Sequence, residues 1–462
     1  MYDIVIKNGT LLDPASERIT VANMAIEHGM IKKITREEII GEEEIDATGK
    51  IVCPGFIDIH THVDGNEACA RSLVAMGVTT AYCGNCGMGV INLEKFFEQY
   101  EKDGFIIHQL EQVGHTTLRE SAGITNRYAP ANEMAIKAMV AKLEELLKLG
   151  ANGISFGLEY VPGSSKEEIV ALSKVVARYS KLISIHTRED GYNGLTSLKE
   201  AISLARITGA SVQVSHLIYQ FGFGMSKEAI RLIDEARSEG LDITADSGMY
   251  SAFATAIGSA VFDEGCLKKW GCGYHNIVAA TGIYRGKRLT KEMFEHLRTS
   301  YPDVTAIGFV GREDEVFECL KRPYVMVSSD AGTMYHNGQP GHPQDTGTYP
   351  RFIRMMVREQ KRLSLMDAIK RCTYLPAKRL GLKAKGSIKE GMDADIVIFD
   401  YSCITDTSTY PCYGDTFSKP EGVEYVIVAG ELVVKESDIL EKKPGKIIRS
   451  ELKKWKWEEC KW

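Results

Sequence analysis

The sequence predicts an α/β protein: a (β/α)8 TIM barrel with a small β-sandwich domain built from both chain ends. Two observations lead to this prediction. Between about residues 55 and 382, eight short apolar segments alternate with amphipathic segments of helical period. The two ends of the chain instead consist of short apolar runs separated by glycine. A doubly wound open sheet is the structural alternative, and the count of eight strands favours the barrel.

The β-sandwich is expected from residues 1–54 together with residues 383–462. The first range contains "YDIVIKNGTLLD", in which short apolar runs flank an Asn-Gly pair. The second contains "DADIVIFD" and "VEYVIVAGELVV", which have the same strand pattern. The shared pattern predicts one domain made from both termini, with the barrel of residues 55–382 inserted between them.

The barrel strands are predicted from runs of apolar and β-branched residues. They are residues 56–60, 78–83, 105–110, 153–160, 182–187, 211–217, 241–246 and 324–330. Helices are predicted at 133–150, 166–180, 197–209 and 227–240, where apolar residues recur at helical spacing. Residues 263–322, rich in Gly, Cys and charge, fall between the last two strands and are predicted to form an insertion over the barrel mouth.

Composition argues against several classes of partner. The net charge is -6 and basic residues do not cluster outside the last turns, so we expect no nucleic acid. No uncharged apolar run reaches membrane-spanning length and the start lacks a signal-peptide pattern, so we expect no membrane. The 11 cysteines are odd in number and irregular in spacing, which favours reduced thiols and a cytoplasmic setting. The expected partner is a small-molecule substrate. The sequence leaves open whether the chain forms a homo-oligomer.

Two histidines, His60 and His62, end the first predicted barrel strand in "IVCPGFIDIHTHVDG". Side chains alternate faces along a strand, so two imidazoles one residue apart point toward the same place. A polar strand end on the surface is the alternative, and the other strand ends decide between the two. Polar residues follow almost every one of those ends: Cys83, Cys86, His108, His115, Glu159, His186, His216, Asp246 and Asp330.

These side chains are predicted to meet, because chemistry in such barrels gathers at the C-terminal face of the strands. Imidazole, thiolate and carboxylate together suit zinc, and the donors exceed the three that one catalytic zinc takes. One or two zinc ions are therefore expected, and two would share a bridging ligand. Asp330 is placed to move a proton, or it could cap the following turn. Cys83 and Cys86 also form a CxxC motif. In other proteins this motif carries out redox chemistry or forms one half of a zinc knuckle.

The motifs "GFIDIHTHVD", "GNCG", "IHTRED", "VSHL" and "SSDAGT" together resemble the amidohydrolase superfamily. The segments "VGHTTLR", "GLEYVPG" and "GHPQDTGTYPR" resemble, more narrowly, its N-acyl-D-amino-acid deacylase (D-aminoacylase) branch. The resemblance implies a zinc amidohydrolase in which Cys86 bridges the metals in place of the carboxylated lysine of hydantoinases. It implies that Asp330 is also the catalytic proton shuttle and that Glu159 is a neighbour of the metals. The implied metal ligands are His60, His62, Cys86, His186, His216 and Asp330.

The sequence departs from this branch where the substrate carboxylate is expected to bind. A lysine of the branch is replaced by Ile218 and an arginine by Gln344. Arg188 could instead support a metal ligand or pair with Glu189, and Arg351 could cap a helix. The remaining candidates for substrate binding are Tyr250, Arg188, His342 and Arg351.

Three functions follow from these residues. The first is hydrolysis of the amide C–N bond of a small N-acylated amino-acid-like molecule. The second is opening of a cyclic amide such as a hydantoin or lactam, which needs no carboxylate-binding cation. The third is a non-catalytic relative that keeps the barrel for assembly. The intact set of metal donors argues against this third function.

Overall fold

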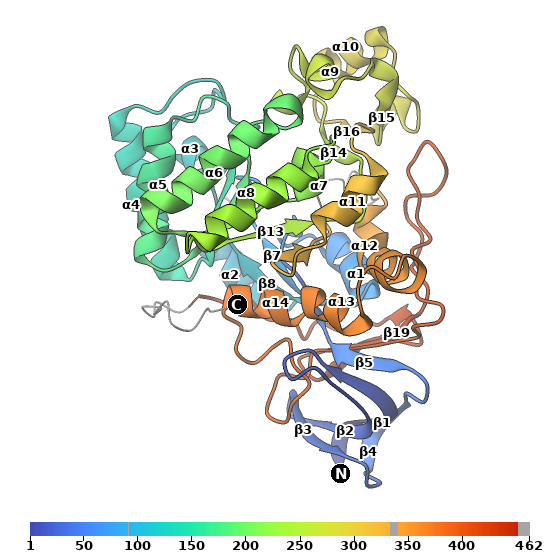
Figure 1. Cartoon of the computed structure of the whole chain (residues 1–462). Helices are drawn as coiled ribbons and strands as arrows, with labels where there is room; N and C mark the ends of the chain where they lie inside the picture. The colour runs from blue at the N-terminus through green and yellow to red at the C-terminus, as the bar shows by residue number, and fades with distance from the viewer. Residues whose placement is uncertain (91, 333–340, 451–462) are drawn as a thin grey trace.

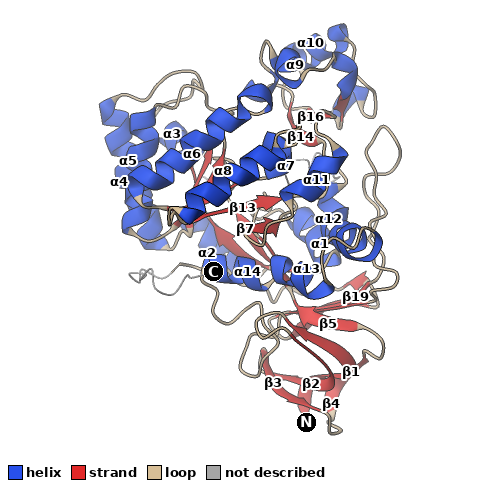
Figure 2. Ribbon diagram, in the orientation of Figure 1, coloured by secondary structure: helices blue, strands red, loops and turns tan. Residues whose placement is uncertain are grey.

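The computed structural model describes residues 1–90, 92–332 and 341–450. Figure 1 shows a strand-rich unit around the N-terminus, a larger helix-covered unit beside it, and a smaller projection in yellow at the far side. Figure 2 shows helices arranged around the strands of the larger unit, whereas the unit at the N-terminus is made mainly of strands. Among the described residues, no helix is both long and apolar enough to cross a bilayer.

Strands from both ends of the chain form one nine-stranded sheet in the order β21-β20-β19-β18-β5-β1-β2-β3, with β4 paired to β1. Its junction is the antiparallel pairing of β5 with β18, in which Val52 lies opposite Ile398. Inward-facing aliphatic side chains such as Ile6, Met24 and Ile396 form its core. The strands are β1 Tyr2–Asp13, β2 Arg18–Glu27, β3 Met30–Thr35, β4 Gly41–Asp46, β5 Ile51–Pro54, β18 Ile396–Phe399, β19 Val423–Val428, β20 Glu431–Lys435 and β21 Asp438–Ile439.

The central strands run parallel in two sheets, β6-β7-β8 and β17-β13-β12-β11-β10-β9. Gln112 alone separates β8 from β9, so these two strands together form the third predicted strand. The backbone N–H of Asp330 donates to the carbonyl of His60 at 2.9 Å, which joins the end of the strand series to its beginning. The strands are β6 Phe56–Asp58, β7 Val78–Cys83, β8 His108–Glu111, β9 Val113–Gly114, β10 Gly153–Gly157, β11 Leu182–His186, β12 Ser211–Val214, β13 Ile243–Ser247 and β17 Val325–Val327.

Helices separate these strands along the chain, and the four predicted helices are confirmed. Local sequence accounts for their starts: Asn132 and Ser165 accept hydrogen bonds from the first turns of α4 and α5. A π-helix at Ile353–Glu359 continues α12. The helices are α1 Glu67–Ala75, α2 Leu93–Asp103, α3 His115–Ser121, α4 Glu133–Leu149, α5 Lys166–Arg178, α6 Gly194–Thr208, α7 Leu217–Phe221, α8 Ser226–Ser238, α11 Glu313–Cys319, α12 Gln344–Phe352, α13 Leu365–Cys372 and α14 Tyr374–Leu380.

The insertion is built on a small antiparallel sheet in the order β14-β16-β15. It begins at Phe253 rather than at residue 263, and its last strand ends at Gly308, because β14 pairs with β16. Residues 313–319 belong instead to α11, which contacts α7 and α8. The insertion contains β14 Phe253–Ala256, α9 Cys266–Trp270, β15 Ile277–Ala279, α10 Lys291–Ser300 and β16 Thr305–Gly308. It also contains 3-10 turns at Ala260–Phe262, Tyr274–Asn276 and Gly282–Tyr284. Outside the insertion, a further 3-10 turn at Gly191–Asn193 precedes α6.

Candidate metal centre

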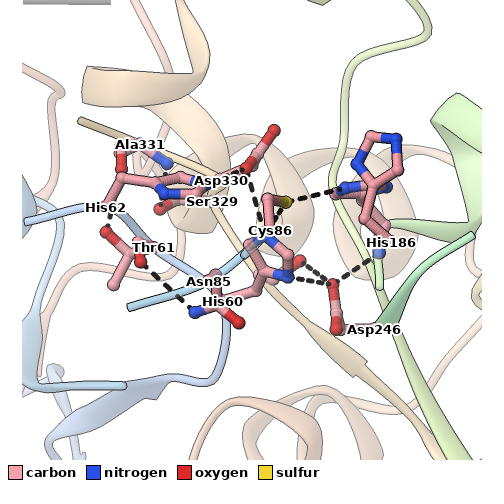
Figure 3. Close-up of polar contacts among 12 residues, drawn as sticks. His60, Thr61, His62, Asn85, Cys86, His186, Asp246, Ser329, Asp330 and Ala331 are labelled. Atoms are coloured by element: carbon pink, nitrogen blue, oxygen red, sulfur yellow. Dashed lines mark hydrogen bonds and ion pairs between the residues drawn. The ribbon is translucent and has the colours of Figure 1, made fainter. Parts of the chain in front are cut away.

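His60 and His62 follow β6, and their imidazoles converge on the carboxylate of Asp330. Asp330 Oδ1 lies 3.3 Å from His60 Nε2 and 3.2 Å from His62 Nε2. All three residues are buried. Asp330 has a φ of 56°, a left-handed conformation that non-glycine residues rarely adopt. The predicted convergence of the first and last strand ends is therefore present in the structure (Figure 3).

Cys86 lies on a buried turn after β7, and its thiol faces two histidines. Its Sγ is 3.3 Å from His60 Nε2 and 3.4 Å from His216 Nε2. The turn is held by Asn85, whose side chain donates to the Tyr82 carbonyl at 2.8 Å. A Cβ at Gly157 would lie 1.9 Å from the Cys86 carbonyl oxygen, so only glycine fits beside this turn.

The potential ligand atoms form two groups that have Cys86 in common. Within each group, the ligand atoms all lie within 4.8 Å of one another. A cysteine thiolate can bridge two metal ions, and imidazole, thiolate and carboxylate are the donors that zinc accepts, so the donor set fits two zinc ions. One group is His60, His62, Cys86 and Asp330, and the other is Cys86, His186 and His216.

The electrostatics of the centre favour the charged form of both acidic ligands. Burial alone would raise the pKa of the Cys86 thiol, but neighbouring His60 and His216 outweigh it and hold that pKa well below its usual range. Burial likewise opposes ionisation of Asp330, and hydrogen bonds from His60 and His62 hold its pKa well below the ordinary value. Burial disfavours the charged form of His62, yet Asp330 and Cys86 raise its pKa to about 10. Both acidic side chains are thus held in their ionised forms, which are the forms that bind a metal ion.

Asp246, at the end of β13, orients the histidines without joining either ligand group. Its Oδ1 accepts from the backbone N–H of His216 and from the Ser328 hydroxyl, both at 2.8 Å. The same oxygen lies 3.6 Å from His60 Nδ1. A carboxylate behind a metal-binding histidine fixes the direction of its ring. The position of Asp246 at a strand end was the signal for this role in the sequence.

Glu159 and Lys269 connect the centre to the insertion. Glu159 Oε2 lies 3.0 Å from His186 Nε2, while its Oε1 accepts from Lys269 Nζ at 2.6 Å. Lys269, from α9, also pairs with Asp190. The pKa of Glu159 falls to about 2, because His186 and Lys269 together outweigh the effect of its burial. Glu159 is thus a neighbour of His186, which is a potential ligand, whereas Lys269 was not identified from the sequence.

Two of the predicted substrate-binding residues, Arg351 and Tyr250, contact each other. The Arg351 guanidinium lies 4.8 Å from the centre of the Tyr250 ring. It also bonds the Met249 carbonyl at 3.0 Å and carboxylates of Glu313 and Asp406 at 2.9 and 3.2 Å. The Tyr250 hydroxyl is buried and has no hydrogen-bond partner among the described residues.

The other two predicted substrate-binding residues also have protein partners. Arg188 forms a fork with Glu200 at 3.0 and 2.8 Å, so its partner is neither Glu189 nor a metal ligand. His342 donates from Nε2 to the Ala252 carbonyl at 3.0 Å and accepts the Gln344 N–H at Nδ1. Burial lowers the pKa of His342 to about 3, so its imidazole is neutral.

Two residues that replace branch-typical cations line the region near Asp330. Gln344 donates from Nε2 to the Asp330 carbonyl at 2.7 Å and accepts the Tyr219 hydroxyl at 2.6 Å. Ile218 is fully buried. Tyr160, which the sequence reasoning did not single out, places its ring centre 4.9 Å from that of His186. Next to Asp330 and His186 the described contacts are thus made by Gln344, Tyr219 and Tyr160, none of which is cationic.

Three strand-end residues noted in the sequence lie outside the two ligand groups. His108 pairs with Asp395 at 3.0 Å. His115 pairs with Glu168 at 2.7 Å. Cys83 belongs to a separate group of potential ligands and does not act with Cys86 as one half of a zinc knuckle.

Comparisons with known proteins identify the family of this chain. The amidohydrolase family profile matches residues 51–433. The chain is 26% identical to the D-aminoacylase of Alcaligenes xylosoxydans xylosoxydans, covering 97% of both chains. It is 28% identical to the N-acyl-D-aspartate deacylase of the same organism, covering 96% of this chain and 95% of the relative.

Solved structures extend the likeness to the fold. The N-acyl-D-glutamate deacylase of Bordetella bronchiseptica, complexed with zinc and a phosphonate inhibitor, superposes with a TM-score of 0.86 at 26% identity, covering 97% of this chain and 100% of that one. The L-hydantoinase of Arthrobacter aurescens has a TM-score of 0.65 at 17% identity, covering 97% and 100% of the two chains, and shows the fold alone. With the family profile covering most of the chain, this protein belongs to the amidohydrolase family.

Proposed function

We propose that this protein is a zinc-dependent hydrolase that cleaves the amide C–N bond of a small N-acylated amino-acid-like substrate. One observation carries the proposal: ligands from five strand ends form two groups that share Cys86. The relatives named D-aminoacylase and N-acyl-D-aspartate deacylase favour an N-acyl amino acid of D configuration. We further propose Cys86 as the bridging ligand of a two-zinc centre.

The division of labour within the site follows from its geometry. When bound, zinc supplies Lewis-acid activation of water and of the amide carbonyl. His60, His62, His186 and His216 would hold the zinc ions through their imidazole nitrogens. The Asp330 carboxylate takes the proton of the attacking water and delivers it to the departing nitrogen. Its side chain, 11% exposed, reaches the accessible side of the centre, which suits such a transfer.

A second candidate, opening of a cyclic amide, is supported by the partners of the cationic side chains. Arg188 and Arg351 are already paired with carboxylates of the protein. Gln344 stands where an arginine is typical of the deacylase branch. A ring substrate has no free carboxylate and needs none of these cations.

A hydrolysis screen separates these candidates. Zinc-loaded protein is assayed on paired D- and L-N-acyl amino acids beside hydantoins and lactams, together with a His216→Ala variant. We expect turnover of one N-acyl series, lost in the variant. Turnover of rings alone would favour the second candidate. No turnover of any of them by fully zinc-loaded protein would refute both.

We also propose a two-domain organisation for the chain. Residues 55–382 form a closed barrel that carries the centre. Residues 1–54 and the chain from residue 383 onward form a small β-sandwich, for which the pairing of β5 with β18 provides the junction. The predicted end at residue 462 is too late, because residues 444–447 pair with Phe105 and Gln109 of the barrel segment.

A further inference from the structure

A third group of potential metal ligands lies outside the centre described above. It consists of Asp64, Cys83 and Glu111, whose ligand atoms lie within 4.8 Å of one another. Cys83 and Glu111 are fully buried, at the ends of β7 and β8, and Asp64 lies on the turn after β6. Neither the family relationship nor the proposed reaction uses these residues.

The described protein supplies no cationic side chain to this group of two acids and a thiol. Glu111 Oε1 accepts from the Gln109 amide, but its buried Oε2 has no hydrogen-bond partner. Asp64 Oδ1 accepts the Gly84 backbone N–H at 2.8 Å, and the Asp64 and Glu111 carboxyl groups are hydrogen-bonding neighbours; burial and Asp64 raise the pKa of Glu111 well above its ordinary value. Across the described ranges, no Lys, Arg or His forms an ion pair within 4.0 Å of either carboxyl group, and His62 acts on Asp64 only at longer range. Burying two carboxylates this way is costly unless a positive species lies between them.

A shared proton would satisfy the two carboxyl groups, and the buried Cys83 thiol would then pack beside them as a small apolar group. A cation that accepts oxygen and sulfur together uses all three atoms. We propose that Asp64, Cys83 and Glu111 bind a divalent cation of the zinc class at a site separate from the catalytic centre. The partly exposed Asp64 side leaves room for a water as fourth ligand.

The position of this site gives it a structural role. Asp64 is two residues from His62, and Cys83 is three residues from Cys86. A cation that ties Asp64 to Cys83 and Glu111 would fix the two turns that carry these catalytic ligands. Cys83 and Cys86 would then hold different metals, although their spacing suggests a shared one.

Cobalt(II) substitution tests the site without relying on activity. A thiolate ligand gives cobalt a charge-transfer absorption in the near ultraviolet, and Cys86→Ala removes the thiolate of the catalytic centre. We expect the folded Cys86→Ala protein to keep a thiolate–cobalt band. The Cys83→Ser/Cys86→Ala and Glu111→Gln/Cys86→Ala proteins should lose it. No band in Cys86→Ala, or a band that survives loss of Cys83, would overturn the proposal.

Zinc content provides a second measurement that does not depend on cysteine variants. Glu111→Gln is expected to lower the zinc bound per folded chain by about one ion, because a neutral amide is a poor zinc ligand. The matched control is Glu98→Gln, an exposed position on α2, which should leave zinc content unchanged. A shared proton predicts no loss in either variant, since the glutamine amide can donate to Asp64. If the catalytic centre itself binds no zinc, the cobalt band of Cys83 is still expected, so the two failures are distinguishable.

Discussion

Asp330 Oδ1 lies 3.2 Å from His62 Nε2, although 268 residues separate the two along the chain. Backbone pairing produces this contact, because the N–H of His62 donates to the Ala331 carbonyl at 2.6 Å and the N–H of Asp330 to the His60 carbonyl. The left-handed φ of Asp330 then turns its carboxylate toward the two imidazoles. The bonds that join the last strand to the first also position the proposed proton shuttle.

Asp330→Asn is expected to lower kcat by about 10²- to 10⁴-fold, the range typical of losing a general acid–base group. An amide keeps the size of the side chain but cannot take the proton of the attacking water. The measurement is kcat at saturating zinc, with metal content determined on the same samples.

The control for this change is Asp303→Asn, an exposed position in the insertion. It should leave kcat unchanged. Zinc-loaded Asp330→Asn with nearly normal kcat would show that the proton is carried by another group.

Cys86→Ala is expected to weaken zinc binding at both ligand groups, because the thiol belongs to both. Zinc content and zinc affinity at equilibrium are measured, and both should fall. Cys403→Ala is the matched control, since Cys403 is an exposed cysteine. Weakened binding of only one ion would mean that Cys86 is a terminal ligand and not a bridge.

The sequence could predict which side chains converge, because each strand and its end can be recognised from the local sequence. In parallel sheets the carboxyl ends of all strands lie at one edge, so His60, Cys86, His186 and His216 had to be near one another once their strands were recognised. The strand-end position of Asp246 was visible as well. Its contacts with His216 and Ser328 depend on side-chain packing and could not be read from spacing.

Contacts made by residues distant in sequence explain what was missed. Lys269 and Glu159 are 110 residues apart, and no periodic pattern connects them. The partner of Arg188 is Glu200, one of several acids that the sequence offers nearby. The start of the insertion was placed too late because β14 is four residues long and gains its partner only from β16.

Lys269→Met is expected to weaken zinc binding at His186 and His216 and to lower kcat by about tenfold, as losing a partner behind a metal ligand commonly does. Without the ammonium, the buried Glu159 carboxylate loses its 2.6 Å bond and no longer holds His186 in one position. Zinc affinity is measured by competition with a chelator, and kcat and KM are determined separately.

Two further variants separate positioning from a general effect on the insertion. Lys268→Met changes an exposed lysine on the same helix and should leave zinc affinity unchanged. Lys269→Arg should restore most of the affinity, because a guanidinium can bind both Glu159 and Asp190. If Lys269→Met binds zinc as tightly as the unmodified protein, the link between the insertion and the centre has no function.

Asp395 connects the terminal sheet to a central strand. Its Oδ1 lies 3.0 Å from His108 Nε2 and accepts the Ala429 N–H at 2.8 Å, while Oδ2 contacts Lys385. Burial would raise the pKa of this carboxyl, but Lys385 and His108 outweigh burial and hold the pKa well below its ordinary range. The ionised carboxylate therefore stabilises the folded state.

Asp395→Asn is expected to lower the free energy of unfolding at pH 7 by on the order of 3 kcal/mol, because it leaves buried Lys385 with one carboxylate fewer. The folded pKa lies below the unfolded value of about 3.9, so the contribution is complete above that pH and fades as the pH falls further. Denaturant unfolding of both proteins should therefore differ at pH 7 and converge under more acidic conditions. Asp393→Asn removes a more exposed partner of Lys385, at 2.9 Å, and should lower the free energy of unfolding by less than Asp395→Asn does. An equal difference at every pH would mean that Asp395 acts through packing and not through its charge.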